Sequence, residues 1–179
     1  MSERLPGRAR VVGDDINSEY IIASTRKRDT LDASLLRHFL LEAVDSSFAA
    51  SVRPGDLLVA GRHFGCGSEM EVAVTVILGA GIPAVLARSF ARSFYRNAIN
   101  NGLVPIECDT TRIREGDRLI IHQNGSLRDV ENLTRGDLLR AAPLPALALD
   151  ILEAGGLVAY VRKSNAGPMG SPGRRAAGS

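Results

Sequence analysis

The sequence predicts a single α/β domain with a mostly parallel central sheet and an added antiparallel portion. Two observations carry this prediction. Between residues 53 and 107, short apolar runs alternate with helix-length segments in the order β, α, β, α, β, and such long connections suit parallel strands. Beyond residue 110 the spacing shortens, and an Asn124-Gly125 pair between two strand-like runs is typical of a β-hairpin.

In the first fifty residues the apolar pattern predicts two short strands and one helix. The strands are expected at 10–16 and 20–24, separated by polar residues. The segment STRKRD follows at 24–29 and is expected to be an exposed loop. Asp32 then precedes apolar residues at helical spacing through 44, so we expect it to cap a helix there.

The middle and the end of the chain continue the alternation. We expect strands at 57–61, 83–87 and 103–107, with helices at 71–81 and 89–102 between them. A hairpin on either side of 124–125, a helix at 143–156 and a last strand at 157–161 complete the pattern. Residues 1–162 then form one domain, and the Gly-, Pro- and Ser-rich segment 163–179 is expected to be a disordered tail.

The composition narrows the class of protein. With 179 residues, 45% of them hydrophobic, the chain is long enough to bury one sizeable core. No apolar run is long enough to span a membrane, and the N-terminus lacks a secretory apolar region, so we expect a cytoplasmic protein that does not bind membranes. Only 4% of the residues are aromatic, which argues against nucleic-acid binding. Two cysteines, Cys66 and Cys108, cannot hold an iron–sulfur cluster, so any such cofactor must come from another chain.

A glycine-rich turn, FGCGSEME at 64–71, joins a predicted buried strand to a predicted buried helix. It lies at the carboxyl end of the strand, where open α/β sheets bind ligands. Gly65 and Gly67 would let the backbone approach a ligand, and the N–H groups of the helix would favour an anion. The spacing of Ser68 and Glu71 also matches a capping box, which stabilises a helix by about 1 kcal/mol and needs no function. The spacing alone leaves both interpretations open.

The wider context resembles one protein family. The run VAGRHFGCGSEMEVAVTVILGAGIPAVLARSFARSFYRNAINNGLVPIEC, at 59–108, is similar to the centre of the 3-isopropylmalate dehydratase small subunits. These belong to the aconitase superfamily and are related to the homoaconitase small subunits. VVGDDINSEYII, at 11–22, resembles the first motif of the same family. Because these segments occur together and in order, the resemblance is far more specific than the turn alone.

The resemblance implies an aconitase-type swivelling β/β/α domain that closes over a separate large subunit, in a heterodimer or heterotetramer. It implies a hydro-lyase of leucine biosynthesis, acting on a malate-like hydroxy dicarboxylic acid such as 3-isopropylmalate. The large subunit would carry a [4Fe–4S] cluster, and this chain would bind no cofactor or metal. A serine from the turn acts as the base in this family, and the match puts that catalytic role on Ser68. The substrate-binding residues expected from the match and from its neighbourhood are Gly65, Cys66, Gly67, Glu69, Asn17, Arg26, Lys27 and Arg28.

The chain departs from the family pattern immediately after Ser68. Where the family has serine, arginine and histidine, this sequence has Glu69, Met70 and Val72. A thioether cannot replace the arginine that grips a substrate carboxylate. Either the substrate differs at that end, or the cation comes from elsewhere, and the three consecutive cations at 26–28 occupy the place of the family's specificity loop. These cations could equally form a solvated loop.

Three functions therefore remain open from the sequence. The first is the dehydration and rehydration of a 3-isopropylmalate-like acid with Ser68 as the base. The second is the same chemistry on another acid, homoaconitate-like or methylmalate-like. The third is a non-catalytic assembly or binding subunit that keeps the swivel fold. The sequence fixes neither the substrate nor the oligomeric state.

Overall fold

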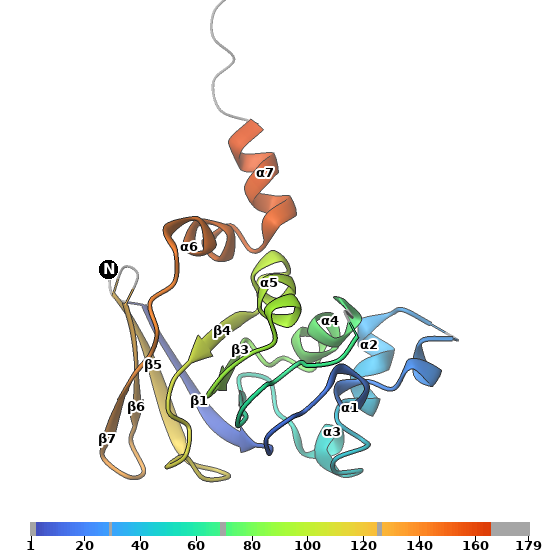
Figure 1. Cartoon of the computed structure of the whole chain (residues 1–179), viewed down its shortest axis with the longest axis horizontal. Coiled ribbons are helices and arrows are strands. Elements are labelled where there is room, and N and C mark those ends of the chain that lie inside the picture. The colour runs from blue at the N-terminus through green and yellow to red at the C-terminus, as the bar shows by residue number, and fades with distance from the viewer. Residues whose placement is uncertain (1–2, 29, 69–70, 125–126, 166–179) are drawn as a thin grey trace, which may run out of the picture.

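The computed structural model describes residues 3–28, 30–68, 71–124 and 127–165. The strands of these residues form one seven-stranded sheet in the order β4-β3-β2-β1-β5-β6-β7 (Figure 1). The strands are β1 (Glu3–Val11), β2 (Leu57–Val59), β3 (Ala84–Ala87), β4 (Val104–Glu107), β5 (Arg118–Asn124), β6 (Leu127–Asn132) and β7 (Asp137–Arg140).

Strand β1 joins a parallel half of the sheet to an antiparallel half. Its last residues pair in parallel with β2, in the register Ala9↔Leu57, whereas its first residues pair antiparallel with β5, in the register Arg8↔Arg118. Strands β2, β3 and β4 continue the parallel half, and β5, β6 and β7 continue the antiparallel half. The predicted fold class is confirmed, although the antiparallel portion is larger than the sequence indicated.

The helices differ widely in length, and only those that follow parallel strands or pack at the carboxyl-terminal end are long. They are α1 (Ser18–Ile21), α2 (Ala33–Leu36), α3 (Phe48–Ser51), α4 (Glu71–Gly79), α5 (Arg92–Asn100), α6 (Ala146–Glu153) and α7 (Leu157–Asn165), with two 3-10 segments, η1 (Ser24–Arg28) and η2 (Arg37–Phe39). None of the helices in the described part of the chain is both long and apolar enough to cross a bilayer.

Two hydrophobic cores lie on opposite faces of the parallel strands. Because side chains alternate along a strand, Leu58 and Val85 point into a core with α2 and α4, whereas Leu57 and Leu86 point into a second core with β5 and β6. The antiparallel half therefore covers the face that the helices leave open. The result is a β/β/α arrangement, as the resemblance implied.

The structure corrects several local predictions. Residues 157–161 belong to helix α7 rather than to a strand, because a short apolar run does not distinguish the two. Residues 20–24 end α1 and begin η1 instead of forming a strand, and β1 begins at Glu3 and ends at Val11. The helix expected through residue 44 breaks into α2 and η2, and Leu41 with φ +56° ends it. Residues 24–28 form the 3-10 helix η1 instead of an open loop, and α3 and β7 were not predicted.

Other elements are confirmed. Asp32 caps α2, since its side chain accepts a hydrogen bond of 2.8 Å from the Ser34 N–H. Helices α4 and α5 and strands β2, β3 and β4 lie where the alternating pattern placed them. Helix α7 continues to Asn165, three residues past the expected end of the domain at 162. Residues 166–179 lie outside the described part of the chain.

Candidate functional site

Three loops lie side by side at the carboxyl ends of the parallel strands. They follow β1 (12–17), β2 (60–68) and β3 (88–91). The Gly65 N–H donates to the Ile16 carbonyl at 2.8 Å and so joins the first loop to the second. The Phe64 N–H donates to the Ser89 carbonyl at 3.0 Å, and the Ala91 N–H donates back to the Phe64 carbonyl at 2.9 Å, which joins the second loop to the third. The middle loop, which carries the glycine-rich turn, is thus held from both sides.

The backbone of the turn requires its two glycines. Gly65 and Gly67 have φ values of +76° and +91°, in the region that side chains rarely adopt. Gly65 is also packed against an aromatic cluster, because a Cβ atom there would lie 2.2 Å from Cγ of Phe94. The Phe94 ring in turn meets the Phe64 ring edge to face, with centroids 5.0 Å apart. This packing fixes the direction in which the chain leaves β2 and reaches Ser68.

Ser18 anchors the far end of the turn. Its side chain is buried, its N–H donates to the Cys66 carbonyl at 2.9 Å, and its hydroxyl donates to the Ser68 carbonyl at 2.6 Å. The neighbouring Asn17 bridges to Cys66, and its side chain caps α1 by accepting from the Tyr20 N–H at 2.9 Å. Ser18 lies within the family's first motif, but the sequence assigned it no definite role.

Ser68 and the backbone beside it remain accessible. Both Gly67 and Ser68 are exposed, and their N–H groups donate no hydrogen bond to any other described residue. Adjacent free N–H groups form a concave site that favours an anion. Helix α4 follows, and the positive end of its dipole points toward the same region. The geometry therefore supports an anion-stabilising cradle around Ser68.

Not every predicted site residue can be placed in this cradle. Gly65, Cys66, Gly67, Ser68 and Asn17 come together in it. Glu69, and Met70 beside it, lie outside the described residues, and so the capping box between Ser68 and Glu71 stays a prediction.

The three consecutive cations belong to η1 and differ in their surroundings. The Arg26 guanidinium binds both carboxylate oxygens of Glu42, at 2.8 and 2.9 Å, and stacks 4.0 Å above the centre of the Phe39 ring. These contacts engage the cation within the chain, and the hydrogen bond to Glu42 raises the pKa of Arg26. Lys27 is half-buried, whereas Arg28 is exposed and makes no ion pair with another described residue. Arg28 is thus the cation of this segment that is most available to a ligand.

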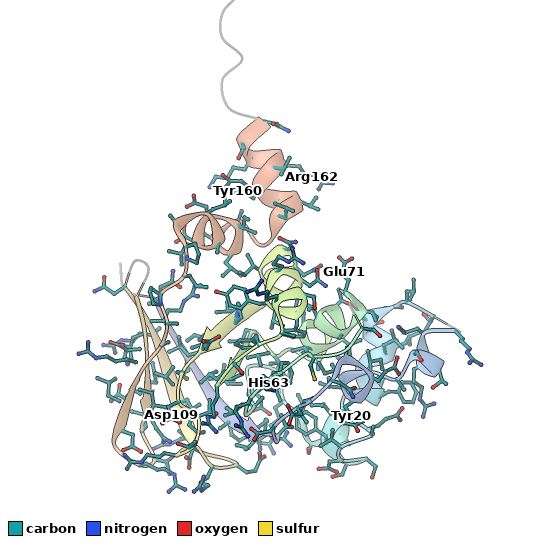
Figure 2. The ribbon with its side chains drawn as sticks, in the orientation of Figure 1. Tyr20, His63, Glu71, Asp109, Tyr160 and Arg162 are labelled. Carbon is teal, nitrogen blue, oxygen red and sulfur yellow. The ribbon has the colours of Figure 1, made fainter. Side chains whose placement is uncertain are left out.

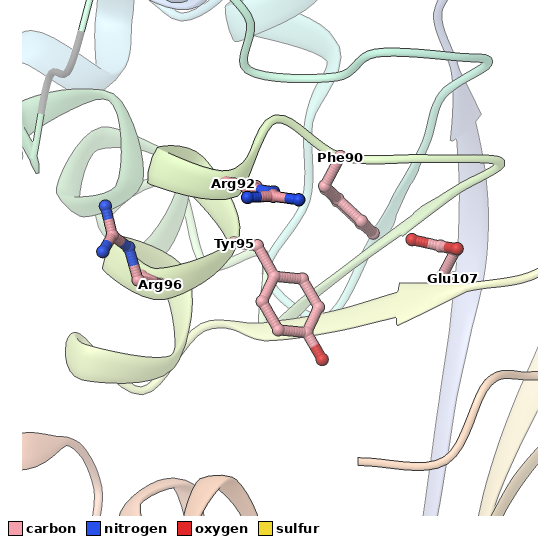
Figure 3. A pocket seen from close by; sticks show the side chains of 5 residues that line it. All are labelled: Phe90, Arg92, Tyr95, Arg96 and Glu107. Atoms are coloured by element: carbon pink, nitrogen blue, oxygen red, sulfur yellow. The ribbon is translucent and has the colours of Figure 1, made fainter. Parts of the chain in front are cut away.

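A pocket of about 480 Å³ adjoins the turn on the side of β3 and α5 (Figure 3). Its walls are Phe90, Arg92, Tyr95, Arg96 and Glu107. Phe90 meets the Phe64 ring of the turn edge to face, with centroids 6.2 Å apart. Arg92 and Arg96 line this pocket from α5, whereas Arg88 lies just past the end of β3.

The described residues contain no evident metal-binding site. No group of three or more histidine, cysteine, aspartate or glutamate side chains within them has a metal-binding arrangement. Cys66 is half-buried in the turn, whereas burial raises the pKa of the Cys108 thiol to about 12 in the second core. These two cysteines cannot supply the three or four thiolates of an iron–sulfur cluster.

An imidazole–carboxylate pair lies beside the turn and was not predicted from the sequence. Nδ1 of His63 lies 2.9 Å from Oδ1 of Asp15, and both side chains are exposed (Figure 2 labels His63). The two residues are 48 positions apart, so no local spacing could have indicated the pair.

Comparisons with known proteins agree with this geometry. The aconitase C-terminal domain family matches residues 17–111. The 3-isopropylmalate dehydratase small subunit of Oleidesulfovibrio alaskensis is 45% identical over 160 residues, covering 88% of this chain and 93% of the relative. The isopropylmalate/citramalate isomerase small subunit of Methanocaldococcus jannaschii is 40% identical over 168 residues, covering 93% and 98%. A crystal structure of 3-isopropylmalate dehydratase from the same organism matches with a TM-score of 0.86 and 39% identity, covering 91% of this chain and 96% of that one.

These matches extend over nearly the whole length of the relatives and include the turn, its flanking strands and both following helices. They confirm the resemblance that the motifs indicated. The chain belongs to the 3-isopropylmalate dehydratase small-subunit family, within the aconitase-type proteins.

Proposed function

We propose that the chain is the small subunit of a hydro-lyase that isomerises 3-isopropylmalate by dehydration and rehydration, with Ser68 as its base. The observation that carries this proposal is an exposed serine, Ser68, whose carbonyl accepts a hydrogen bond from Ser18. The N–H groups of Gly67 and Ser68 donate to no other residue in the described part of the chain. The family membership supports the reaction type, since the relatives carry the name of this enzyme's small subunit. That name also implies a large-subunit partner.

Ser68 would act on the carbon next to a substrate carboxylate. Its oxygen takes the proton from that carbon while the neighbouring carbon loses its hydroxyl, and a separate acid group of the assembled complex would protonate that hydroxyl to water. On rehydration the same serine oxygen returns a proton to carbon. A serine is a weak base in water, so the free N–H groups and the start of α4 are needed to favour the alkoxide form. The large subunit's [4Fe–4S] cluster would supply Lewis acidity toward the leaving hydroxyl.

We propose that cations of η1 contribute to binding a carboxylate of the substrate. The arginine that follows the turn in the family is absent here, and Arg28 is an exposed cation in the family's specificity segment. Arg26 would have to give up its two bonds to Glu42 before it could bind a substrate. We therefore propose Arg28, with Lys27 beside it, as the cation that meets the end of the acid remote from the reacting carbon.

The test uses the chain co-expressed with its large subunit and loaded with its cluster. The chain alone is expected to be inactive, and the complex is expected to turn over 3-isopropylmalate. Ser68→Ala should abolish turnover without dissociating the complex, whereas Ser46→Ala, which changes another exposed serine, should leave it unchanged. Full activity of the Ser68→Ala complex would refute the serine base. The mass of the complex in solution will also distinguish a heterodimer from a heterotetramer.

A second substrate deserves a place in the same assay. The Methanocaldococcus jannaschii relative is named for citramalate as well as isopropylmalate, and Glu69-Met70 replace the family's carboxylate-binding residues in this chain. Efficient turnover of 3-isopropylmalate alone would remove the case for a changed specificity. Turnover of citramalate at a comparable kcat/KM would establish a broader one. A complex that forms normally but acts on neither acid would favour the non-catalytic alternative, which the relatives do not support.

A further inference from the structure

We propose that Asp15 and His63 form a positioning pair that holds the Ser68 turn in its working geometry. The inference rests on the proposed role of Ser68 and adds two residues that neither the motif nor the family match assigned. The pair lies where the loop after β1 meets the loop after β2, immediately before the turn, and Figure 2 labels its His63.

The backbone at both residues is unusual. Asp15 and His63 each have φ +55°, in the left-handed region that residues other than glycine seldom adopt. Such a conformation costs free energy and persists only where the surrounding structure enforces it. Residues of this kind cluster at functional sites. Here two left-handed residues from separate loops face each other across one hydrogen bond. If these positions only had to turn the chain, glycine would adopt the positive φ values at lower cost. The side chains of Asp15 and His63 therefore need another explanation.

A set of short bonds clasps the two loops together. The Asp15 carboxylate can only accept, so the His63 Nδ1–H donates to it, at 2.9 Å. The Asp15 N–H donates to the Arg62 carbonyl at 2.8 Å, and the Arg62 N–H donates to Oδ1 of Asp14 at 2.7 Å. The third loop joins through the His63 N–H, which donates to Oγ of Ser89 at 2.9 Å. Three loops therefore converge on His63.

The clasp is connected directly to the turn. The His63 carbonyl accepts from the Cys66 N–H at 3.3 Å and so closes the turn on one side. On the other side the chain runs from Asp15 to Ser18, whose hydroxyl and N–H hold the Ser68 and Cys66 carbonyls. The pair thus adds a side-chain bond to the backbone hydrogen bonds that join these two loops beside Ser68. Loosening it would let the serine shift without unfolding the core.

Stability alone does not explain the pair. The side chains of His63 and Asp15 are 65% and 68% exposed, and exposed pairs of this kind contribute little to stability. Two left-handed residues, by contrast, cost stability. The pair therefore costs folding free energy overall, and it lies beside the proposed base. This combination is expected if the pair positions the turn for the reaction.

The experiment uses the assembled complex and substitutions that separate backbone from side chain. His63→Asn and His63→Gly both tolerate a left-handed backbone but remove the imidazole, and Asp15→Gly tolerates the same backbone and removes the carboxylate. Each should leave the unfolding temperature of the chain unchanged or raised, and lower kcat about ten-fold or more with KM within about two-fold. The double variant Asp15→Gly/His63→Gly should be no slower than either single variant, because both changes remove the same contact.

A matched control is available on the hairpin. His122 and Glu131 form a similar imidazole–carboxylate pair at 2.8 Å on β5 and β6, and His122→Asn should leave kcat unchanged. The proposal is overturned if His63→Asn and His63→Gly keep wild-type kcat, if their losses follow a loss of unfolding temperature, or if the double variant loses the product of the two single effects. Ser68→Ala is measured in parallel. An active Ser68→Ala complex refutes the serine base, whereas an inactive one beside fully active His63 variants refutes only the positioning pair.

Discussion

Replacing Gly65 by alanine should damage the turn more than the same change two residues later. At Gly65 the new Cβ would lie 2.2 to 2.5 Å from three atoms of the Phe94 side chain, which is buried and cannot retreat. This overlap adds about 1–3 kcal/mol of overpacking to about 1–2 kcal/mol for a left-handed alanine. The sum, roughly 2–5 kcal/mol, corresponds to a fall in Tm of roughly 5–15 °C for a chain of this size.

Gly67→Ala is the matched control. It has a φ value of +91°, but its Cβ would lie 3.5 Å from Cβ of Asn17, an ordinary contact, so only the left-handed cost of about 1–2 kcal/mol remains. Thermal unfolding of the isolated chain, followed by circular dichroism, measures both changes. Equal shifts in Tm for the two variants would show that Phe94 does not constrain the turn. A Gly65→Ala chain as stable as the wild type would refute the described packing altogether.

Three further predictions concern charge and cysteine reactivity. Burial raises the pKa of Asp56, but the hydrogen bonds that its carboxylate accepts from Arg8 and from the Arg53 N–H outweigh burial and lower this pKa overall. The ionised carboxylate therefore stabilises the fold fully above about pH 4, and this stabilisation is lost as the pH falls further. Urea unfolding of Asp56→Asn should show less acid dependence below about pH 4 than that of the wild type. Arg28→Ala should raise KM about ten-fold with kcat nearly unchanged in steady-state kinetics, and an unchanged KM would exclude this cation from the substrate grip. Because its pKa is about 12, Cys108 is thiolate in roughly one molecule in ten thousand at pH 8, so mass spectrometry after iodoacetamide should find Cys66 labelled first.

The parallel half of the fold was predictable because its signals are local. The apolar runs of β2 and β3 are bounded by glycine and proline, and α4 and α5 have the length and periodicity of helices. The failures have equally physical causes. In 157–161 a five-residue apolar run fits a strand or a helix, and packing of Tyr160 against α6 selects the helix. At Leu41 a left-handed backbone ends the predicted helix, and its N–H bonds to the Ile21 carbonyl, a tertiary contact without a sequence signature.

The residues of the candidate site also differ in whether local sequence patterns indicate them. Ser68 and its glycines were found because they are neighbours in the sequence and match a family motif. Ser18 and the Asp15–His63 pair were not, because each reaches its partner across 48 or more residues through the pairing of loops at the carboxyl edge. Local patterns indicate which chemistry a turn can perform. The residues that hold the turn in place appear only once the strands are ordered.

The exposure of Ser68 has a consequence for how the enzyme must be built. An alkoxide in contact with bulk water would be protonated, and the N–H groups that favour it would be screened by solvent. In this chain both Gly67 and Ser68 are exposed, so the described residues do not exclude water from the turn. The proposed role of Ser68 would therefore require the large subunit to cover the turn during the reaction. A base that becomes effective only when the partner closes over it would keep the isolated chain inactive, and it would couple proton removal to assembly of the site.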